Sequence, residues 1–154
     1  MHLGFVTRLA PVVLLALCAC ATQSGTSTSA TAAPVASALA PATSNGQAIF
    51  QTGRDASGKQ IVALKTPLIK SCAACHRADG AGGVHLSGGA VSADLRHAAL
   101  TSKQKVPYTV SSLERAISTG VDNLGKPLDP VMPRWKLSKQ DLHDVATYVF
   151  TQLK

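Results

Sequence analysis

The sequence predicts an all-α domain in which local signals mark three helices, preceded by a disordered N-terminal tether. Two observations predict the domain: polar N-cap residues stand at the start of several segments, and apolar residues then recur at steps of three and four positions. A third predicts the tether, because residues 21–43 are almost entirely Ala, Thr, Ser and Pro and carry no charge. Such a composition cannot bury a core. We therefore expect the folded domain to span residues 44–154.

Residues 1–20 have the pattern of an export signal. Arg8 precedes an uncharged apolar run at residues 9–17. This run is too short to cross a bilayer as a stable helix, and it has the length of a signal-peptide core. The sequence therefore predicts export, which places the mature protein on the periplasmic side of a bacterial envelope.

The end of this signal resembles the lipobox of bacterial lipoproteins. It reads Leu17-Cys18-Ala19-Cys20, with Cys20 in the position of the acylated residue. The resemblance implies a lipid anchor at Cys20, and the absence of Asp directly after Cys20 points to the outer membrane. A triacylated terminus would hold firmly, since stable anchoring needs more than one buried chain. The alternative is an ordinary signal peptide that happens to contain cysteines.

The composition favours a basic domain with few aromatic residues. Lys and Arg number 15 against 8 Asp and Glu, and the formal net charge is +7. No run of four or more basic residues occurs, which argues against nucleic-acid binding. A basic surface could steer the domain toward an acidic partner or anionic headgroups, or be simply solvated. Because aromatic residues make up only 4% of the chain, we expect something besides side chains to help fill the core.

The first helix is predicted to begin at residues 44–47, which form a capping box with Ser44 at the N-cap and Gln47 at N3. Gly53 is expected to end it. The segment 51–71 then carries a turn signal, Asp55-Ala56-Ser57-Gly58, followed by an apolar stretch. We expect this segment to form a small hairpin or a loop.

Two further helices are predicted in the second half of the chain. The middle one is capped by Ser111 and ended by Gly120, and the last one is capped by Ser138. Tyr148 flanks the apolar face of the last helix and is expected to pack near Phe50. The apolar positions are Leu113, Ala116 and Ile117 in the middle helix and Leu142, Val145, Ala146, Val149 and Leu153 in the last.

The motif that carries chemistry is Cys72-Ala73-Ala74-Cys75-His76. Cys-x-x-Cys-His is the attachment pattern of c-type haem. Two thiols one helical turn apart can add to the two vinyl groups on one edge of a porphyrin, and the next residue offers an imidazole to the iron. The motif predicts one haem c, bound covalently through Cys72 and Cys75, with His76 as the proximal iron ligand.

Three other interpretations of this cysteine pair compete with haem attachment. A structural disulfide is one. A thioredoxin-like redox pair is another, but it needs a βαβ context that is not visible. Half of a zinc site is the third, and it needs two further ligands at suitable spacing. His85 and His97 form no second paired motif, so the adjacent His76 favours haem.

Met132 is the candidate for the second axial ligand. A low-spin electron carrier needs a sixth ligand, usually Met or His, and Met raises the reduction potential. A lone Met is ordinarily core filler. This one, however, lies among Pro127, Pro130 and Pro133, and a stretch so rich in proline is stiff and cannot be regular helix. Such a loop can present a sulfur atom at a fixed position.

Three histidines are rivals of Met132 for this role. His85 follows a Gly-rich stretch and is expected at the surface or near the haem propionates. His97 could line the haem edge. His143 lies in the last helix and is expected to be exposed. Met132 is preferred because the stiffness of its loop suits axial ligation.

Taken together, these parts resemble the class I cytochrome c family, and in particular bacterial monohaem members. The resemblance covers residues 44–154. It rests on the attachment motif, on the order of the helices, on Met132-Pro133 and on a last helix carrying Tyr148. It implies the cytochrome c fold, three to five helices around one covalently bound haem. It also implies close approach of the last helix to Gly46, a residue that otherwise weakens a helix.

Two features depart from the compact members of that family. The segment 51–71 separates the first helix from the attachment motif, where these members have a short connection. Arg77 follows His76 where many bacterial relatives have Gly. We expect Arg77 to be exposed at the surface.

The resemblance implies one-electron transfer between periplasmic redox proteins, with no catalytic residues. An alternative is an electron-transfer subunit of a periplasmic dehydrogenase or reductase, which would have the same chemistry at the haem. A haem-based sensor or a peroxidase would need an open sixth position, and no basic distal pair encourages that interpretation. A lipoprotein with a disulfide and no haem is the remaining alternative.

Overall fold

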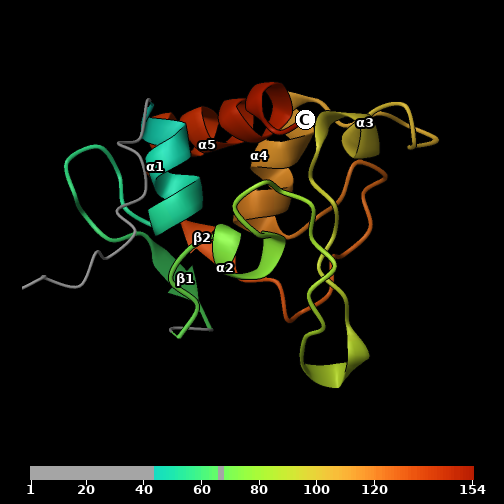
Figure 1. Ribbon diagram of the computed structural model, residues 1–154, viewed down its shortest axis with the longest axis horizontal. Helices are drawn as coiled ribbons and strands as arrows, with labels where there is room; N and C mark the ends of the chain where they lie inside the picture. The colour runs from blue at the N-terminus through green and yellow to red at the C-terminus, as the bar shows by residue number, and fades with distance from the viewer. Residues whose placement is uncertain (1–43, 66–67) are drawn as a thin grey trace, which may run out of the picture. The chain divides into compact units, whose positions relative to one another are not determined.

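The computed structural model describes residues 44–65 and 68–154. The predicted signal peptide, tether and Cys20 lie outside the described residues. Within them, five α-helices and two short strands confirm the expected all-α class (Figure 1). The elements are α1 (Asn45–Thr52), β1 (Val62–Leu64), α2 (Ala73–His76), a 3-10 turn η1 (Ser87–Gly89), α3 (His97–Leu100), α4 (Val110–Thr119), β2 (Arg134–Lys136) and α5 (Lys139–Gln152).

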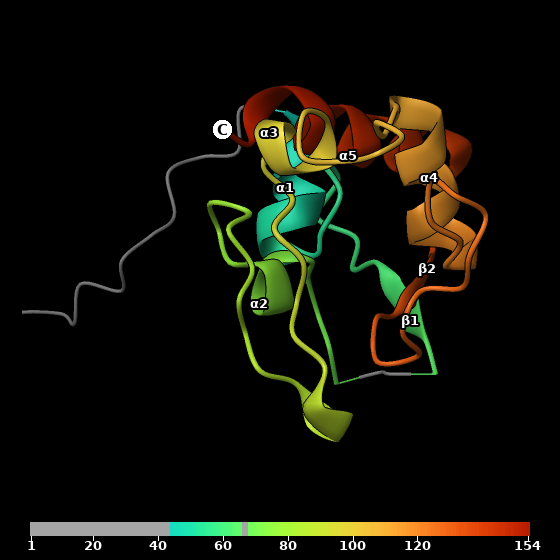
Figure 2. The same cartoon turned by 90° about the vertical axis from the view of Figure 1, so that its right-hand side faces the viewer.

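The core lies where α5 crosses α1 and α4. The two helices α1 and α4 stand apart from each other, and α5 lies across the same end of both (Figure 2). Ile49, Phe50 and Val145 are fully buried in this core. The single tryptophan, Trp135 of β2, is also buried. No helix in the described part of the chain is long and apolar enough to span a membrane.

The helix α1 begins and ends where the sequence predicts. The Ser44 hydroxyl accepts a hydrogen bond from the Gln47 backbone N–H at 3.1 Å and so satisfies a donor that the first turn leaves unpaired. Gly53 ends the helix in the left-handed conformation, with φ 69°, and its N–H donates to the Ile49 carbonyl. Glycine adopts this conformation without the strain that a Cβ would add.

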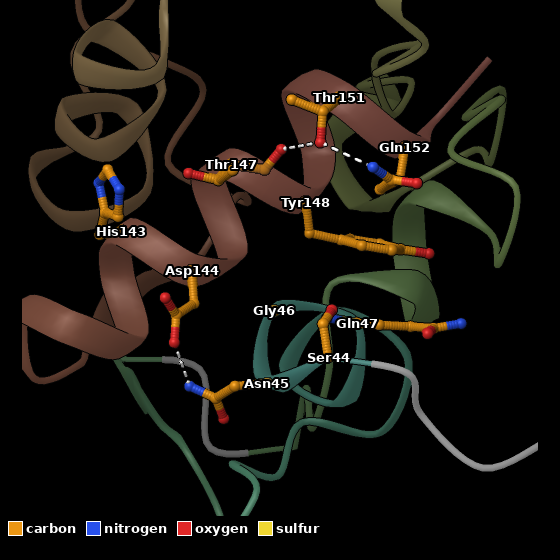
Figure 3. A pocket seen from close by; sticks show the side chains of 10 residues that line it. All are labelled: Ser44, Asn45, Gly46, Gln47, His143, Asp144, Thr147, Tyr148, Thr151 and Gln152. Atoms are coloured by element: carbon orange, nitrogen blue, oxygen red, sulfur yellow. Dashed lines mark hydrogen bonds between the residues drawn. The ribbon is translucent and has the colours of Figure 1, made fainter.

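The contact between α1 and α5 confirms the close approach expected at Gly46. A Cβ placed there would lie 2.2 Å from the Asp144 carbonyl oxygen and 2.8 Å from the Tyr148 Cβ. Figure 3 shows Gly46 beside Asp144 and Tyr148 of α5, with Asn45 hydrogen-bonded to Asp144 at 2.7 Å. Phe50 packs on Tyr148 with 5.6 Å between ring centroids, also as predicted. The absence of a side chain at Gly46 therefore lets two helices touch through their backbones.

The helix α4 begins two residues earlier than the sequence analysis predicts. Its N-cap is Thr109 and not Ser111. The Thr109 hydroxyl accepts from the Ser112 N–H at 3.2 Å, and the Ser112 hydroxyl accepts from the Thr109 N–H at 2.8 Å. A serine thus takes the N3 role usually played by Glu or Gln, which is why the true cap was missed. The predicted end at Gly120 is confirmed.

The segment after α1 makes the predicted turn, but its strand pairs elsewhere. The turn closes with a hydrogen bond from the Gly58 N–H to the Asp55 carbonyl at 2.9 Å, and a single bridge joins Arg54 to Gln60. Beyond it, β1 pairs antiparallel with β2, which follows Met132-Pro133 in the chain. The inserted segment is therefore fastened to the strand that continues from the Met132 loop.

Candidate functional site

The structure brings Cys72, Cys75, His76 and Met132 to one cavity of about 370 Å³. Residues of the helices α1 to α5 and of the strand β2 line it, and Figure 2 shows these elements arranged around one region of the domain. Most of the walls are apolar. Their large apolar side chains include Phe50, Leu100, Leu113, Ile117, Trp135 and Val149.

The attachment motif forms one short helical turn on the cavity wall. Cys72 is the residue before α2, and its carbonyl accepts hydrogen bonds from the backbone N–H groups of Cys75, at 3.2 Å, and His76, at 3.0 Å. Both cysteines are free thiols. Residues three and four positions apart on a helical turn lie on the same face. This turn therefore directs the two thiols and the imidazole toward a common space.

A hydrogen bond to a backbone carbonyl orients the His76 ring. Its Nδ1 lies 2.9 Å from the Ala93 carbonyl oxygen. A carbonyl can only accept, so Nδ1 carries the proton and Nε2 keeps its lone pair for a metal ion. Burial lowers the pKa of the imidazole below its ordinary value, and this hydrogen bond offsets part of that shift. Neutral imidazole is the form that binds metals.

Ser92 fixes the loop that supplies this carbonyl. Its hydroxyl donates to the Cys75 carbonyl at 2.8 Å and accepts from the Val84 N–H at 2.9 Å. The Ser92 side chain is buried. It therefore ties the segment next to Ala93 directly to α2. Neither residue can be recognised from the sequence, because a backbone acceptor carries no sequence signal and a single serine is not distinctive.

The two thiols are neutral at physiological pH. Burial raises the pKa of the Cys72 thiol to about 12 and also raises that of Cys75. The Cys72 residue is partly exposed to the cavity, but its sulfur is more deeply buried among protein atoms than the sulfur of Cys75. Both sulfurs are therefore thiols, not thiolates, in the chain alone.

Met132 lies on a tight turn at the cavity. Its N–H donates to the Asp129 carbonyl at 3.1 Å, and the Asp129 carboxylate accepts from the Val131 N–H at 2.9 Å. Pro130 is the second residue of this turn and Pro133 follows it directly, so both restrict the backbone here. The expectation of an irregular, constrained loop is confirmed, and its methionine is among the residues that line the cavity.

The three rival histidines do not line this cavity. His85 is exposed on the loop that carries η1. His97 is also exposed, and its Nδ1 lies 2.8 Å from the Phe150 carbonyl. His143 is exposed as predicted and pairs with Glu114 at 2.8 Å. The expectation that His97 could line the haem edge therefore has no support in the cavity lining.

Arg77 is exposed, as the sequence analysis predicts. Its φ of 63° and ψ of 164° fall in a region that glycine adopts readily and other residues rarely do. Arginine occupies it here with its side chain in solvent.

A second, larger cavity of about 730 Å³ lies between the start of α1 and α5 (Figure 3). Its lining is polar and includes Ser44, Asn45, Asp144 and Thr147. Neither cysteine of the motif belongs to it. It is therefore not a candidate for haem, despite its size. Among the described residues, no group of three or more His, Cys, Asp or Glu side chains is arranged to hold a metal ion.

Comparison with known proteins agrees with this site. A model of the cytochrome c family matches residues 43–152. The matched segment includes all five helices and the four side chains that meet at the cavity. A search of curated proteins gives no significant match. The chain belongs to the cytochrome c family, whose members transfer electrons through covalently bound haem.

Proposed function

We propose that this chain is a one-electron carrier with a single haem c, held covalently by Cys72 and Cys75 and ligated by His76 and Met132. The observation that carries the proposal is the convergence of these four side chains on one largely apolar cavity. The donor set fits the group. It consists of two thiols, an imidazole whose Nε2 is free and a thioether, and these are the side chains that c-type haem uses.

Each residue has a separate task in this proposal. When bound, the haem supplies a one-electron Fe(III)/Fe(II) couple. Cys72 and Cys75 keep it attached, and the Ala93 carbonyl holds the His76 ring in one orientation. The turn that ends at Met132 presents the thioether. The apolar walls exclude water and so limit reorganisation of solvent around the charge.

Two axial protein ligands leave no position for a substrate. This supports a carrier in preference to a sensor or a peroxidase, both of which need an open sixth position. We propose a class I, bacterial type of cytochrome that works in the periplasm. The partners would be other redox proteins or a periplasmic oxidoreductase. A lipid anchor at Cys20 would hold the domain near the outer membrane, as the resemblance of residues 17–20 to a lipobox suggests.

The test compares Met132→Ala with the wild type after expression with c-type haem maturation. We expect wild-type ferric protein to show the weak red-edge absorption band of haem ligated by methionine sulfur. The variant should lose this band, and its ferrous form should bind carbon monoxide within the mixing time. A wild type that lacks the band, or that binds carbon monoxide as fast as the variant, would exclude Met132 as a ligand and favour a sensor or an enzyme.

A further inference from the structure

Arg134, which follows Met132-Pro133, extends its side chain back into the loop that carries the methionine. Its Nη2 donates to the Leu128 carbonyl at 3.0 Å. Its Nη1 donates to the Met132 carbonyl and, at 3.4 Å, to the Asp129 carbonyl. One guanidinium therefore spans the beginning and the end of the Met132 loop.

The loop needs donors of this kind because its own backbone has few. Pro127, Pro130 and Pro133 have no N–H group. Carbonyl groups in a partly buried loop still require hydrogen-bond donors. Arginine suits this task because its planar group presents several N–H donors in a fixed fork, and a lysine ammonium does not.

Gly120 provides the space in which the guanidinium lies. A Cβ at this position would lie 1.7 Å from the Arg134 Nε and 2.0 Å from its Cζ. The guanidinium is thus in contact with the backbone at the end of α4. The Leu128 N–H also donates to the Gly120 carbonyl at 2.8 Å. The side chain and the loop are therefore both tied to the same helix end.

The backbone of Arg134 is held from the other side by the inserted segment. Leu64 of β1 pairs with Arg134, and Ala63 pairs with Trp135. Trp135 is 5% exposed and belongs to the core. Strand pairing and a buried neighbour thus fix the point from which the arginine side chain starts. This gives the segment between α1 and the attachment motif a structural task.

We propose that Arg134 is a positioning residue for Met132. Its guanidinium fixes the positions of the Leu128 and Met132 carbonyls relative to each other, so that the loop keeps the thioether directed at the cavity. β1 and Gly120 hold the arginine itself. This inference rests on the proposed ligation of iron by Met132, and it predicts that Arg134 sets how readily that ligand is displaced.

Imidazole in solution measures this property, because it binds ferric haem only when the methionine sulfur leaves. We expect Arg134→Gln to bind imidazole roughly tenfold more tightly than the wild type. This corresponds to a free-energy preference for the methionine-bound state that is about 1.4 kcal/mol smaller than in the wild type. Arg134→Lys should lie between the two, because it keeps the charge but not the fork. The readout is the loss of the red-edge band during an imidazole titration of the ferric holoprotein.

The matched control is Arg54→Gln. Arg54 is exposed, donates to the Gly58 carbonyl at 2.7 Å, and does not line the cavity. Its replacement removes the same charge and a bond of the same type. We expect no change in imidazole affinity, and an increase equal to that of Arg134→Gln would overturn the proposal by showing an effect of charge alone.

The outcomes separate this inference from the proposed function. If wild-type protein lacks the band, Met132 does not ligate the iron, and it is the proposed function that is contradicted. If the band is present and Arg134→Gln binds imidazole as weakly as the wild type, the positioning role is wrong. If Arg134→Gln loses its helical circular dichroism, the test uses Arg134→Lys instead. An imidazole affinity equal to that of the wild type in Arg134→Lys would then overturn the proposal.

Discussion

Replacing both Cys72 and Cys75 by alanine is expected to leave the haem-free domain without a cooperative unfolding transition. The cavity of about 370 Å³ extends into the middle of the core and is lined by residues of all five described helices. At ~24 cal/mol per Å³, the value for a closed cavity, leaving such a volume empty would cost at most about 9 kcal/mol, because part of it opens to solvent. This is comparable with the whole stability of an ordinary domain, about 5–15 kcal/mol.

Urea titrations followed by far-ultraviolet circular dichroism and by emission from Trp135 measure this effect. Trp135 is the only tryptophan and is buried against the cavity, so its emission reports whether the core has formed. The control is Cys75→Ala, which leaves one thioether and His76 and should keep haem and a cooperative transition. A haem-free double variant that melts cooperatively with native helix content would show that haem is not part of the core.

Gly46→Ala is expected to destabilise the holoprotein, although helix propensity predicts the opposite sign. In an exposed helix, alanine in place of glycine stabilises by about 1 kcal/mol. Here the added Cβ would lie 2.2 Å from the Asp144 carbonyl oxygen, which is backbone and cannot rotate away. The two helices must therefore separate. Overpacking of this kind costs about 1–3 kcal/mol, and Gly46→Val should cost more.

The free energy of unfolding of the ferric holoprotein, obtained from guanidinium titrations, tests this prediction. We expect Gly46→Ala to be less stable than the wild type and Gly46→Val to be less stable again. The Phe50 and Tyr148 rings, 5.6 Å apart across the same interface, should separate in both variants. Equal or greater stability of Gly46→Ala would mean that α1 and α5 do not touch at this residue.

The sequence predicted those helix ends that are set by contacts between residues close together in the chain. Ser44 and Ser138 accept hydrogen bonds from the N–H groups three residues later, and Gly53 and Gly120 end their helices in the left-handed conformation. The start of α4 was missed because a serine can replace Glu or Gln in a capping box. Helix caps are predicted from residues close together in the sequence, and the cap of α4 is an unusual pair, Thr109 and Ser112.

Contacts between distant segments could not be predicted in the same way. The pairing of β1 with β2 joins two three-residue strands far apart in the chain, and each alone is too short to give a pattern. The Ala93 carbonyl that orients His76 belongs to the backbone and so leaves no trace in residue type. Nothing in the sequence pattern singles out Arg134, because its bonds to the Met132 loop depend on the space left by Gly120.

We propose that this chain carries one electron on one covalently attached haem. The most direct measurement is an anaerobic potentiometric titration of the purified holoprotein, followed in the visible spectrum, with haem counted per chain after denaturation. We predict one haem that stays with the denatured chain and a single reversible one-electron transition. A chain without attached haem, with more than one haem, or with no reversible one-electron transition would contradict this account.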